Sequence, residues 1–144
     1  MAVVGKPSKI GKYDVVEILG EGGMGAVYKA VDPRIGRTVA IKVIKGDFAQ
    51  EPELRRRFDT EARAVGNLQH PNIVTVFDFG EENGSPYLVM QYLDGTPLDK
   101  VIAQRLNLPF IQKLDIIIGV LKALDYAHEH GVIHRDVKIG RAHV

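Results

Sequence analysis

The sequence predicts an α+β fold in which a five-stranded antiparallel sheet with one inserted helix is followed by a helical segment. Short runs rich in β-branched residues alternate with turn compositions through most of the first 92 residues. One segment between the third and fourth runs has helical spacing, and the periodic segments after residue 95 are all helical. Because consecutive strands joined by short turns pair with each other, the sheet is expected to be antiparallel.

Composition restricts the protein to a few classes. The chain has 144 residues, of which 45% are hydrophobic and 26% charged, which suits one ordinary globular domain. A net charge of +1 argues against a nucleic-acid partner. The absence of cysteine excludes disulfide scaffolds, thiolate zinc sites and cysteine nucleophiles. There is no signal-peptide core at the N-terminus, and the longest apolar run, Ile116 to Leu121, is too short to span a membrane, so a soluble, cytoplasmic chain is expected.

Five runs are expected to form the strands. The first three follow one another closely, as in an antiparallel meander, and the last two are joined by the turn-prone segment Glu82 to Pro86. Between the third and fourth, Pro52 to Leu68 is expected to be a helix because Leu54, Phe58 and Ala62 recur at steps of four. The expected strands are Tyr13–Leu19, Ala26–Val31, Thr38–Ile44, Ile73–Phe79 and Tyr87–Tyr92.

Two helices are expected in the last third of the chain, whereas residues 1–12 are expected to be loose. Thr96 is predicted to cap the first helix, with Pro97 at the first helical position and the end near Gln104. Pro109 opens a longer helix, which Gly131 ends. The apolar residues of the longer helix fall on one stripe, formed by Phe110, Leu114, Ile117, Leu121 and Leu124, with Ile118 alongside.

A glycine cluster, Gly20-Glu21-Gly22-Gly23-Met24-Gly25, separates the first two predicted strands. Glycines at this spacing let backbone N–H groups approach phosphates closely. A tight hairpin turn without a ligand has the same composition, so the motif by itself leaves both interpretations open. Dinucleotide-binding folds use a similar motif but continue it as a helix, whereas Ala26-Val27-Tyr28 has strand composition.

Lys42 lies in the middle of an apolar predicted strand. Alternation places Ala40, Lys42 and Ile44 on one face of that strand. A buried lysine needs a charged partner, and Glu61, close to the apolar stripe of the following helix, can supply one. Because exposed ion pairs contribute little stability, such a pair is expected to position a ligand. The alternative is an edge-strand lysine that reaches water.

A third cluster, His134-Arg135-Asp136-Val137-Lys138, follows the strand-like pair Val132-Ile133. An aspartate that accepts a hydroxyl proton, close to a lysine that neutralises phosphate charge, suits phosphoryl transfer to an alcohol. A charged loop without chemistry is the alternative. A zinc site at His128, His130 and His134 is disfavoured, because the first two residues lie at a helix end and do not face one another.

In their order and spacing, these motifs resemble the eukaryotic-like (Hanks-type) serine/threonine protein kinases, particularly the bacterial branch. The resemblance implies a partial kinase domain over residues 13–138, with residues 13–93 as the N-lobe and hinge and residues 94–138 as the first helices of an incomplete C-lobe. The matching segments are Leu19–Val27, Val39–Lys42, Phe58–Ala62, His70–Val74, Tyr87–Gly95 and His134–Lys138.

The resemblance also implies roles for single residues. The backbone of the glycine cluster would cover the ATP phosphates, and Lys42, oriented by Glu61, would hold the α and β phosphates. Asp136 would be the catalytic base, and Lys138 would contact the γ-phosphate. Val27 and Ala40 would cover the adenine, Met90 would be the gatekeeper, and the backbone of Gln91 and Leu93 would bind the adenine edge. The full ATP-binding set is Leu19, Gly20, Glu21, Gly22, Gly23, Met24, Gly25, Ala26, Val27, Ala40, Lys42, Glu61, Met90, Gln91 and Leu93.

The two magnesium ligands of the family have no match in this chain. Arg141 stands where the family has an asparagine, and no Asp-Phe-Gly motif follows. The resemblance therefore implies a parent enzyme that transfers the γ-phosphoryl group of Mg-ATP to Ser or Thr hydroxyls of proteins, whereas the 144-residue chain itself is predicted to be inactive. Residues 139–144 look like the translation of a sequencing-library adapter, and a membrane anchor in the parent is compatible with the family.

Three alternatives to a protein kinase remain at this point. A non-catalytic, nucleotide-binding pseudokinase is disfavoured for the parent by the intact Lys42, Glu61 and Asp136, and the Asp-Phe-Gly region would decide the question. A small-molecule phosphotransferase of kinase-like fold would share the phosphate-binding parts, although the form of the His134–Lys138 segment favours protein substrates. A dehydrogenase is disfavoured by the strand that follows the glycine cluster.

Overall fold

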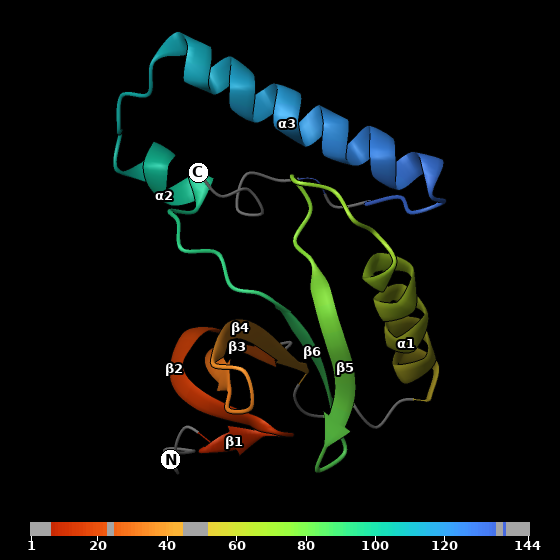
Figure 1. Cartoon of the computed structure of the whole chain (residues 1–144). Coiled ribbons are helices and arrows are strands. Elements are labelled where there is room, and N and C mark those ends of the chain that lie inside the picture. Colours follow the sequence, from red (N-terminus) through yellow and green to blue (C-terminus); the bar gives the residue numbers. More distant parts are fainter. Residues whose placement is uncertain (1–6, 23–24, 45–51, 135–136, 138–144) are drawn as a thin grey trace. The chain divides into compact units, whose positions relative to one another are not determined.

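A computed structural model describes residues 7–22, 25–44, 52–134 and 137 of the chain (Figure 1). The chain divides into two compact units. The N-terminal unit comprises residues 1–67 and 75–92, and the C-terminal unit comprises residues 68–74 and 93–144. Each unit is described separately below. The expected tail at residues 139–144 lies outside the described residues.

The N-terminal unit contains an antiparallel sheet with the strand order β1-β2-β3-β4-β6-β5. Helix α1 (Pro52–Gly66) is inserted between β4 and β5 and lies beside β5 (Figure 1). The predicted α+β class and the inserted helix are therefore confirmed. The strands are β1 (Lys9–Ile10), β2 (Tyr13–Gly22), β3 (Gly25–Asp32), β4 (Arg37–Ile44), β5 (Val76–Glu82) and β6 (Ser85–Gln91).

The sheet has six strands, one more than the sequence predicts, because β1 forms in the segment expected to be loose. This strand turns back on β2 through Gly11, whose φ of 55° lies in the region that favours glycine. A Cβ at Gly11 or at Gly80 would overlap the Tyr87 hydroxyl, so the Tyr87 side chain fills a slot between these two backbones. The Gly11 N–H donates to Glu82 Oε2 at 2.7 Å. A two-residue strand is too short to give a periodic signal in the sequence.

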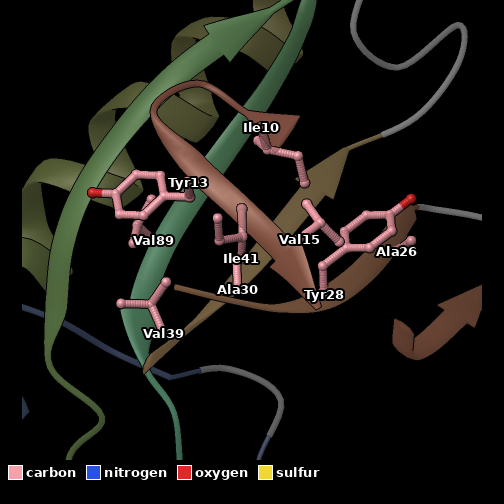
Figure 2. Close-up of a cluster of buried hydrophobic side chains, with 9 residues drawn as sticks. All are labelled: Ile10, Tyr13, Val15, Ala26, Tyr28, Ala30, Val39, Ile41 and Val89. Atoms are coloured by element: carbon pink, nitrogen blue, oxygen red, sulfur yellow. The ribbon is translucent and has the colours of Figure 1, made fainter. Parts of the chain in front are cut away.

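The core of this unit lies on one face of the sheet. Ile41 and Val89 are completely buried and lie opposite each other on β4 and β6. Figure 2 shows the nine side chains of this cluster, which come from β1, β2, β3, β4 and β6. Val39 and Ile41 of β4 belong to this cluster, as the predicted alternation of faces requires, but burial does not alternate strictly, because Ala40 on the Lys42 face is also buried while Lys42 is exposed. The cluster consists of Ile10, Tyr13, Val15, Ala26, Tyr28, Ala30, Val39, Ile41 and Val89.

Truncation of Ile41 is expected to lower the free energy of unfolding by about 2–5 kcal/mol, because it removes buried methyl groups and leaves a cavity in a packed core. Chemical denaturation of Ile41→Ala measures this effect. Ile35→Ala is the matched control, since the Ile35 side chain is 64% exposed and its loss should cost less than about 0.5 kcal/mol. Equal destabilisation by the two variants would contradict the assigned core.

The turn between β3 and β4 is organised by Asp32. Its Oδ1 accepts a hydrogen bond from the Arg34 N–H at 3.0 Å, and its carbonyl oxygen accepts one from the Gly36 N–H at 2.8 Å. Lys12 Nζ lies 3.5 Å from Asp32 Oδ2. The hydrogen bond from the Arg34 backbone, assisted by the Lys12 charge, lowers the pKa of the Asp32 carboxyl group below its ordinary value.

This lowered pKa predicts a pH-dependent contribution to stability. The contribution is present above the pKa of Asp32 in the unfolded chain, about 4, and is lost as the pH falls through the lower pKa of the folded state. The difference in unfolding free energy between the parent chain and Asp32→Asn should therefore be constant near neutral pH and shrink below about pH 4. Urea denaturation of both proteins over this range measures it, and a difference that grows on acidification would refute the assignment.

The C-terminal unit contains helices α2 (Leu98–Ala103) and α3 (Phe110–Glu129). Both predicted helices are confirmed, but the first is preceded by Pro97 at the cap position and not by Thr96, and no side chain caps it. The segment Val132-Ile133 is not a strand. None of the helices in the described part of the chain is long and apolar enough to cross a membrane.

The two helices end in the same hydrogen-bond pattern. At the end of α3, the Val132 and Gly131 N–H groups donate to Ala127 and His128, and Gly131 has a φ of 76°. Glycine is the usual residue at this left-handed position, which confirms the predicted stop at Gly131. At the end of α2, the Leu106 and Arg105 N–H groups donate to Val101 and Ile102, and Arg105 takes the left-handed position with a φ of 52°.

Segment 68–74 is attached to α3 within this unit. Leu68 is buried, and the Gln69 N–H lies 3.4 Å from the Tyr126 hydroxyl oxygen. The Tyr126 ring lies between two imidazoles, with ring centroids 5.2 Å from His70 and 4.1 Å from His130. Strand β5 begins at Val76, later than the predicted Ile73, because the Ile73 N–H is engaged in a turn with the His70 carbonyl.

Candidate functional site

The register of the sheet brings four of the predicted ATP-binding residues onto one face. Residues directly opposite each other in antiparallel strands project to the same side. Val27 of β3 lies opposite Lys42 of β4, and Ala40 of β4 lies opposite Met90 of β6. Lys42 and Ala40 are two residues apart and share a face. These four residues, here called the open face, lie on the side of the sheet opposite the Ile41 core.

Lys42 stands on an interior strand. Strand β4 pairs with β3 on one side and with β6 on the other, which excludes the edge-strand interpretation of this lysine. The Lys42 side chain is exposed and not buried, contrary to the premise of the sequence argument, so its amine is accessible from the open face. The side chain of Glu61 lies outside the described part of the chain, and the Lys42–Glu61 ion pair therefore stays a prediction.

A second lysine, Lys29 of β3, lies on the same face, opposite Ala40. Its Nζ lies 3.4 Å from Glu17 Oε1 and 4.6 Å from the centroid of the Tyr92 ring. The hydrogen bond to Glu17, followed by the one to Tyr92, raises the pKa of the Lys29 amine. Lys29 is thus held by its own neighbours, which distinguishes it from Lys42 as a candidate for binding an anion.

The glycine cluster forms the end of the β2–β3 hairpin, where Gly22 pairs with Gly25. Gly25 has a φ of 150°, and a Cβ at this position would overlap the carbonyl oxygen of Val43 on β4. At Gly20 and Gly22, by contrast, an added Cβ would meet no atom within 4 Å. Gly23 and Met24 lie outside the described residues. A strand follows the cluster, as predicted, and this disfavours a dinucleotide-binding fold.

The remaining predicted contacts follow the end of β6. The Gln91 N–H donates to the Thr75 carbonyl oxygen at 2.8 Å, so this N–H is already engaged and does not face an adenine edge as a free donor. Leu19, Glu21 and Gln91 are exposed, and Ala26 is buried within the core cluster, on the face opposite Val27. Leu93 is exposed and belongs to the C-terminal unit.

Asp136 and Lys138, the predicted catalytic residues, lie outside the described residues, and their roles stay predictions. Their neighbours His134 and Val137 are exposed.

Two further residues join the open face without having been predicted there. Leu88 of β6 lies opposite Lys42, and Val76 of β5 lies opposite Met90. The period-two alternation of β6 signals Leu88, which is two residues before Met90. No local signal indicates Val76, because its place depends on the pairing of β5 with β6 and on the register shift between Val76 and Asp78.

The open face fits a nucleotide. Val27, Leu88 and Met90 offer a partly buried apolar surface for a base, and Lys42 offers an exposed cation for phosphate. The open space around Gly20 and Gly22 lets a phosphate approach the backbone. The described residues offer no comparable site for a magnesium ion, since they contain no group of His, Asp or Glu side chains that could hold a metal.

Comparison with known proteins defines the class. The family model described as the protein kinase domain matches residues 13–140, and the chain therefore belongs to the protein kinase family. Among solved structures, a crystal structure of the Mycobacterium tuberculosis PknI kinase domain superposes with a TM-score of 0.81 at 37% sequence identity. That match covers 94% of this chain and 55% of the PknI chain. The predicted kinase-like fold is thereby confirmed.

The similar curated proteins are bacterial serine/threonine kinases. The chain is 42% identical over 135 residues to the serine/threonine-protein kinase PknA of Mycobacterium tuberculosis, covering 90% of this chain and 31% of PknA. It is 43% identical over 132 residues to a probable serine/threonine-protein kinase of Streptomyces coelicolor, covering 89% of this chain and 20% of that protein. The chain thus spans less than a third of either relative. Members of the protein kinase family use ATP and Mg²⁺ and act on proteins.

Proposed function

We propose that this chain is the nucleotide-binding part of a protein kinase that transfers the ATP γ-phosphoryl group to Ser or Thr hydroxyls of proteins. The observation that carries the proposal is the pairing of Val27 with Lys42 and of Ala40 with Met90 on the open face. This register sets a cation beside an apolar surface, next to a glycine hairpin. A triphosphate attached to an aromatic base needs these three features together.

In this proposal, each part of the nucleotide meets a different part of the chain. The backbone from Gly20 to Gly25 covers the phosphates, and the Lys42 amine neutralises the α and β phosphates. Glu61 orients Lys42 from α1. Val27 and Ala40 cover the adenine, and Met90 closes the far end of the base site. The Gln91 carbonyl and the Leu93 backbone bind the adenine edge.

The chemical step is assigned to the segment that follows α3. Asp136 would accept the proton of the substrate hydroxyl, and Lys138 would neutralise charge on the γ-phosphate. The lysine two residues after the aspartate favours Ser and Thr over Tyr as the acceptor. A magnesium ion would supply further neutralisation of the phosphate charge, but the chain has Arg141 where the family has a ligating asparagine, so the proposed roles concern only the chain's own residues.

A non-catalytic nucleotide-binding module is the second candidate, and Arg141 favours it for the 144-residue chain itself. Such a module would bind ATP without turnover, because positioning and charge neutralisation account for most of the rate in phosphoryl transfer. Under either candidate, the kinase domain is proposed to lie in the cytoplasm, where ATP is available.

Two measurements test the proposal. A fluorescent ATP analogue should bind the 144-residue chain and be displaced by ATP and ADP but not by NADH. In a longer form of the protein, [γ-³²P]ATP should label peptides that contain Ser or Thr, while peptides containing only Tyr stay unlabelled. Binding without labelling would select the non-catalytic module, and NADH displacement would overturn both candidates.

A further inference from the structure

Helix α1 meets the sheet on the side that carries the open face. Phe79 of β5 lies opposite Leu88 of β6, which in turn lies opposite Lys42 of β4, so these three residues project to the same side. Glu81, two residues after Phe79 on β5, projects to that side as well. There it meets α1, because Arg55 Nη2 donates a hydrogen bond to Glu81 Oε2 within an ion pair. This contact therefore joins α1 to the side of the sheet on which Lys42 stands.

The two halves of α1 are buried to different extents. In the second half, Ala62 is only 5% exposed. In the first half, residues 52–60, none of the side chains that the structure describes is buried, and Phe58 is partly exposed. A hollow of about 200 Å³ lies between this half and the β5–β6 hairpin, with Asp59 and Phe79 in its lining. Apolar packing therefore fixes the first half of α1 only weakly, since burial of an apolar face is what holds a helix in place.

The Arg55–Glu81 ion pair connects the two sides of this hollow. Both residues line it, and their side chains are 42% and 45% exposed. An ion pair that is exposed to this degree contributes little to the free energy of unfolding. A hydrogen bond between charged groups nevertheless fixes the geometry of the two groups that it joins. Here it fixes where the first half of α1 lies over β5.

We propose that Arg55 and Glu81 are positioning residues for nucleotide binding, because their ion pair holds α1 where Glu61 can orient Lys42. The inference rests on the proposed function, and neither Arg55 nor Glu81 belongs to the open face. Glu61 follows Arg55 by six residues in the same helix, so a displacement of the first half of α1 displaces Glu61 as well. Loss of the ion pair lowers the fraction of molecules in which Lys42 is oriented, and the apparent affinity for ATP falls with that fraction.

Phosphorylation of a Ser/Thr peptide by a longer form of the protein tests the effect on ATP. Arg55→Gln should raise the KM for ATP about twofold to fivefold and change kcat less than about twofold, because saturating ATP selects the competent position of α1. Arg55→Glu places two like charges together and should raise the KM further. Combining Arg55→Glu with Glu81→Arg restores opposite charges and should return the KM to within about twofold of the parent value. Arg56→Gln, which removes an exposed arginine from the same turn of α1, is the matched control and should leave the KM unchanged.

A distance measurement on the 144-residue chain tests the position of α1 without any catalytic step. The chain has no cysteine, so cysteines introduced at two exposed positions, Thr60 of α1 and Ile35 of the β3–β4 turn, can carry nitroxide labels. Pulsed electron paramagnetic resonance then reports the distribution of distances between the labels. Arg55→Gln should broaden this distribution, the charge-reversed pair should restore it, and Arg56→Gln should leave it as in the parent chain.

The outcomes distinguish this inference from the proposed function. If the parent protein labels peptides but Arg55→Gln and Arg56→Gln give equal KM values, or the charge-reversed pair brings no recovery, the inference alone is wrong. A broadened distribution of distances with an unchanged KM would likewise overturn it, since the ion pair would then hold the helix without acting on Lys42. If the parent protein neither binds the ATP analogue nor labels peptides, the proposed function fails and this inference fails with it.

Discussion

Replacing Lys42 by methionine is expected to abolish phosphoryl transfer in a longer, active form of this protein, lowering kcat/KM at least about a hundredfold. Methionine keeps most of the length and the apolar stem of lysine but removes the charge from the open face. Loss of one preorganised charge that faces the developing phosphate charge costs catalysis by this order of magnitude. Labelling of a Ser/Thr peptide by [γ-³²P]ATP measures the effect, and the fluorescent ATP analogue reports binding separately.

Lys29→Met is the matched control for this prediction. It makes the same substitution on the same face of the sheet, one strand away, at a lysine already engaged by Glu17 and Tyr92. It is expected to change activity less than about threefold, because the Lys29 amine is not free to bind phosphate. If Lys42→Met retained near-normal activity, or if the two variants lost activity equally, the role assigned to Lys42 would be wrong.

Among the described glycines of the cluster, Gly25 is expected to be the least tolerant of alanine, with a loss of about 3 kcal/mol in unfolding free energy for Gly25→Ala. The added Cβ would overlap the Val43 carbonyl oxygen, and the φ of 150° is one that residues with a Cβ rarely adopt. The overlapping atom belongs to the backbone of β4, so β3 and β4 must move apart. The midpoint of thermal unfolding should fall by roughly 6–12 °C.

Gly22→Ala provides the comparison within the same hairpin. Gly22 pairs directly with Gly25, but a Cβ there meets no atom within 4 Å, so its unfolding midpoint should stay within about 2 °C of the parent chain. If this open space is used by phosphate, Gly22→Ala should weaken the ATP analogue while leaving stability intact. A stable Gly25→Ala protein would show that the hairpin is placed incorrectly against β4.

Much of the N-terminal unit follows from local patterns. The period-two alternation of β4 predicts that Val39 and Ile41 share the core face, and the order of the glycine cluster, Lys42 and the helix predicts the family. Strand β1 is not predictable in this way, because two residues carry no period and their pairing depends on distant contacts at Tyr87 and Glu82. The prediction of Thr96 as the N-cap of α2 was wrong, because Thr96 and the observed cap residue Pro97 both suit the start of a helix.

The candidate site is predictable only in part. Residue types and spacing identify Lys42 and Val27, but their direct opposition depends on the register of β3 and β4, which the sequence does not specify. The left-handed conformation of Arg105 is equally hidden, because glycine or asparagine is the residue expected there.

The slot around Tyr87 affects where the N-terminal boundary of a recombinant form of this protein should be placed. The family match begins at residue 13, but one wall of the slot is the backbone of Gly11, and Ile10 is only 3% exposed. A gene designed to start at Tyr13 would remove that wall and uncover the Tyr87 phenol. It would also remove the Gly11 N–H that donates to the Glu82 carboxylate. Expression boundaries for this protein are therefore better placed at or before Pro7 than at the edge of sequence similarity.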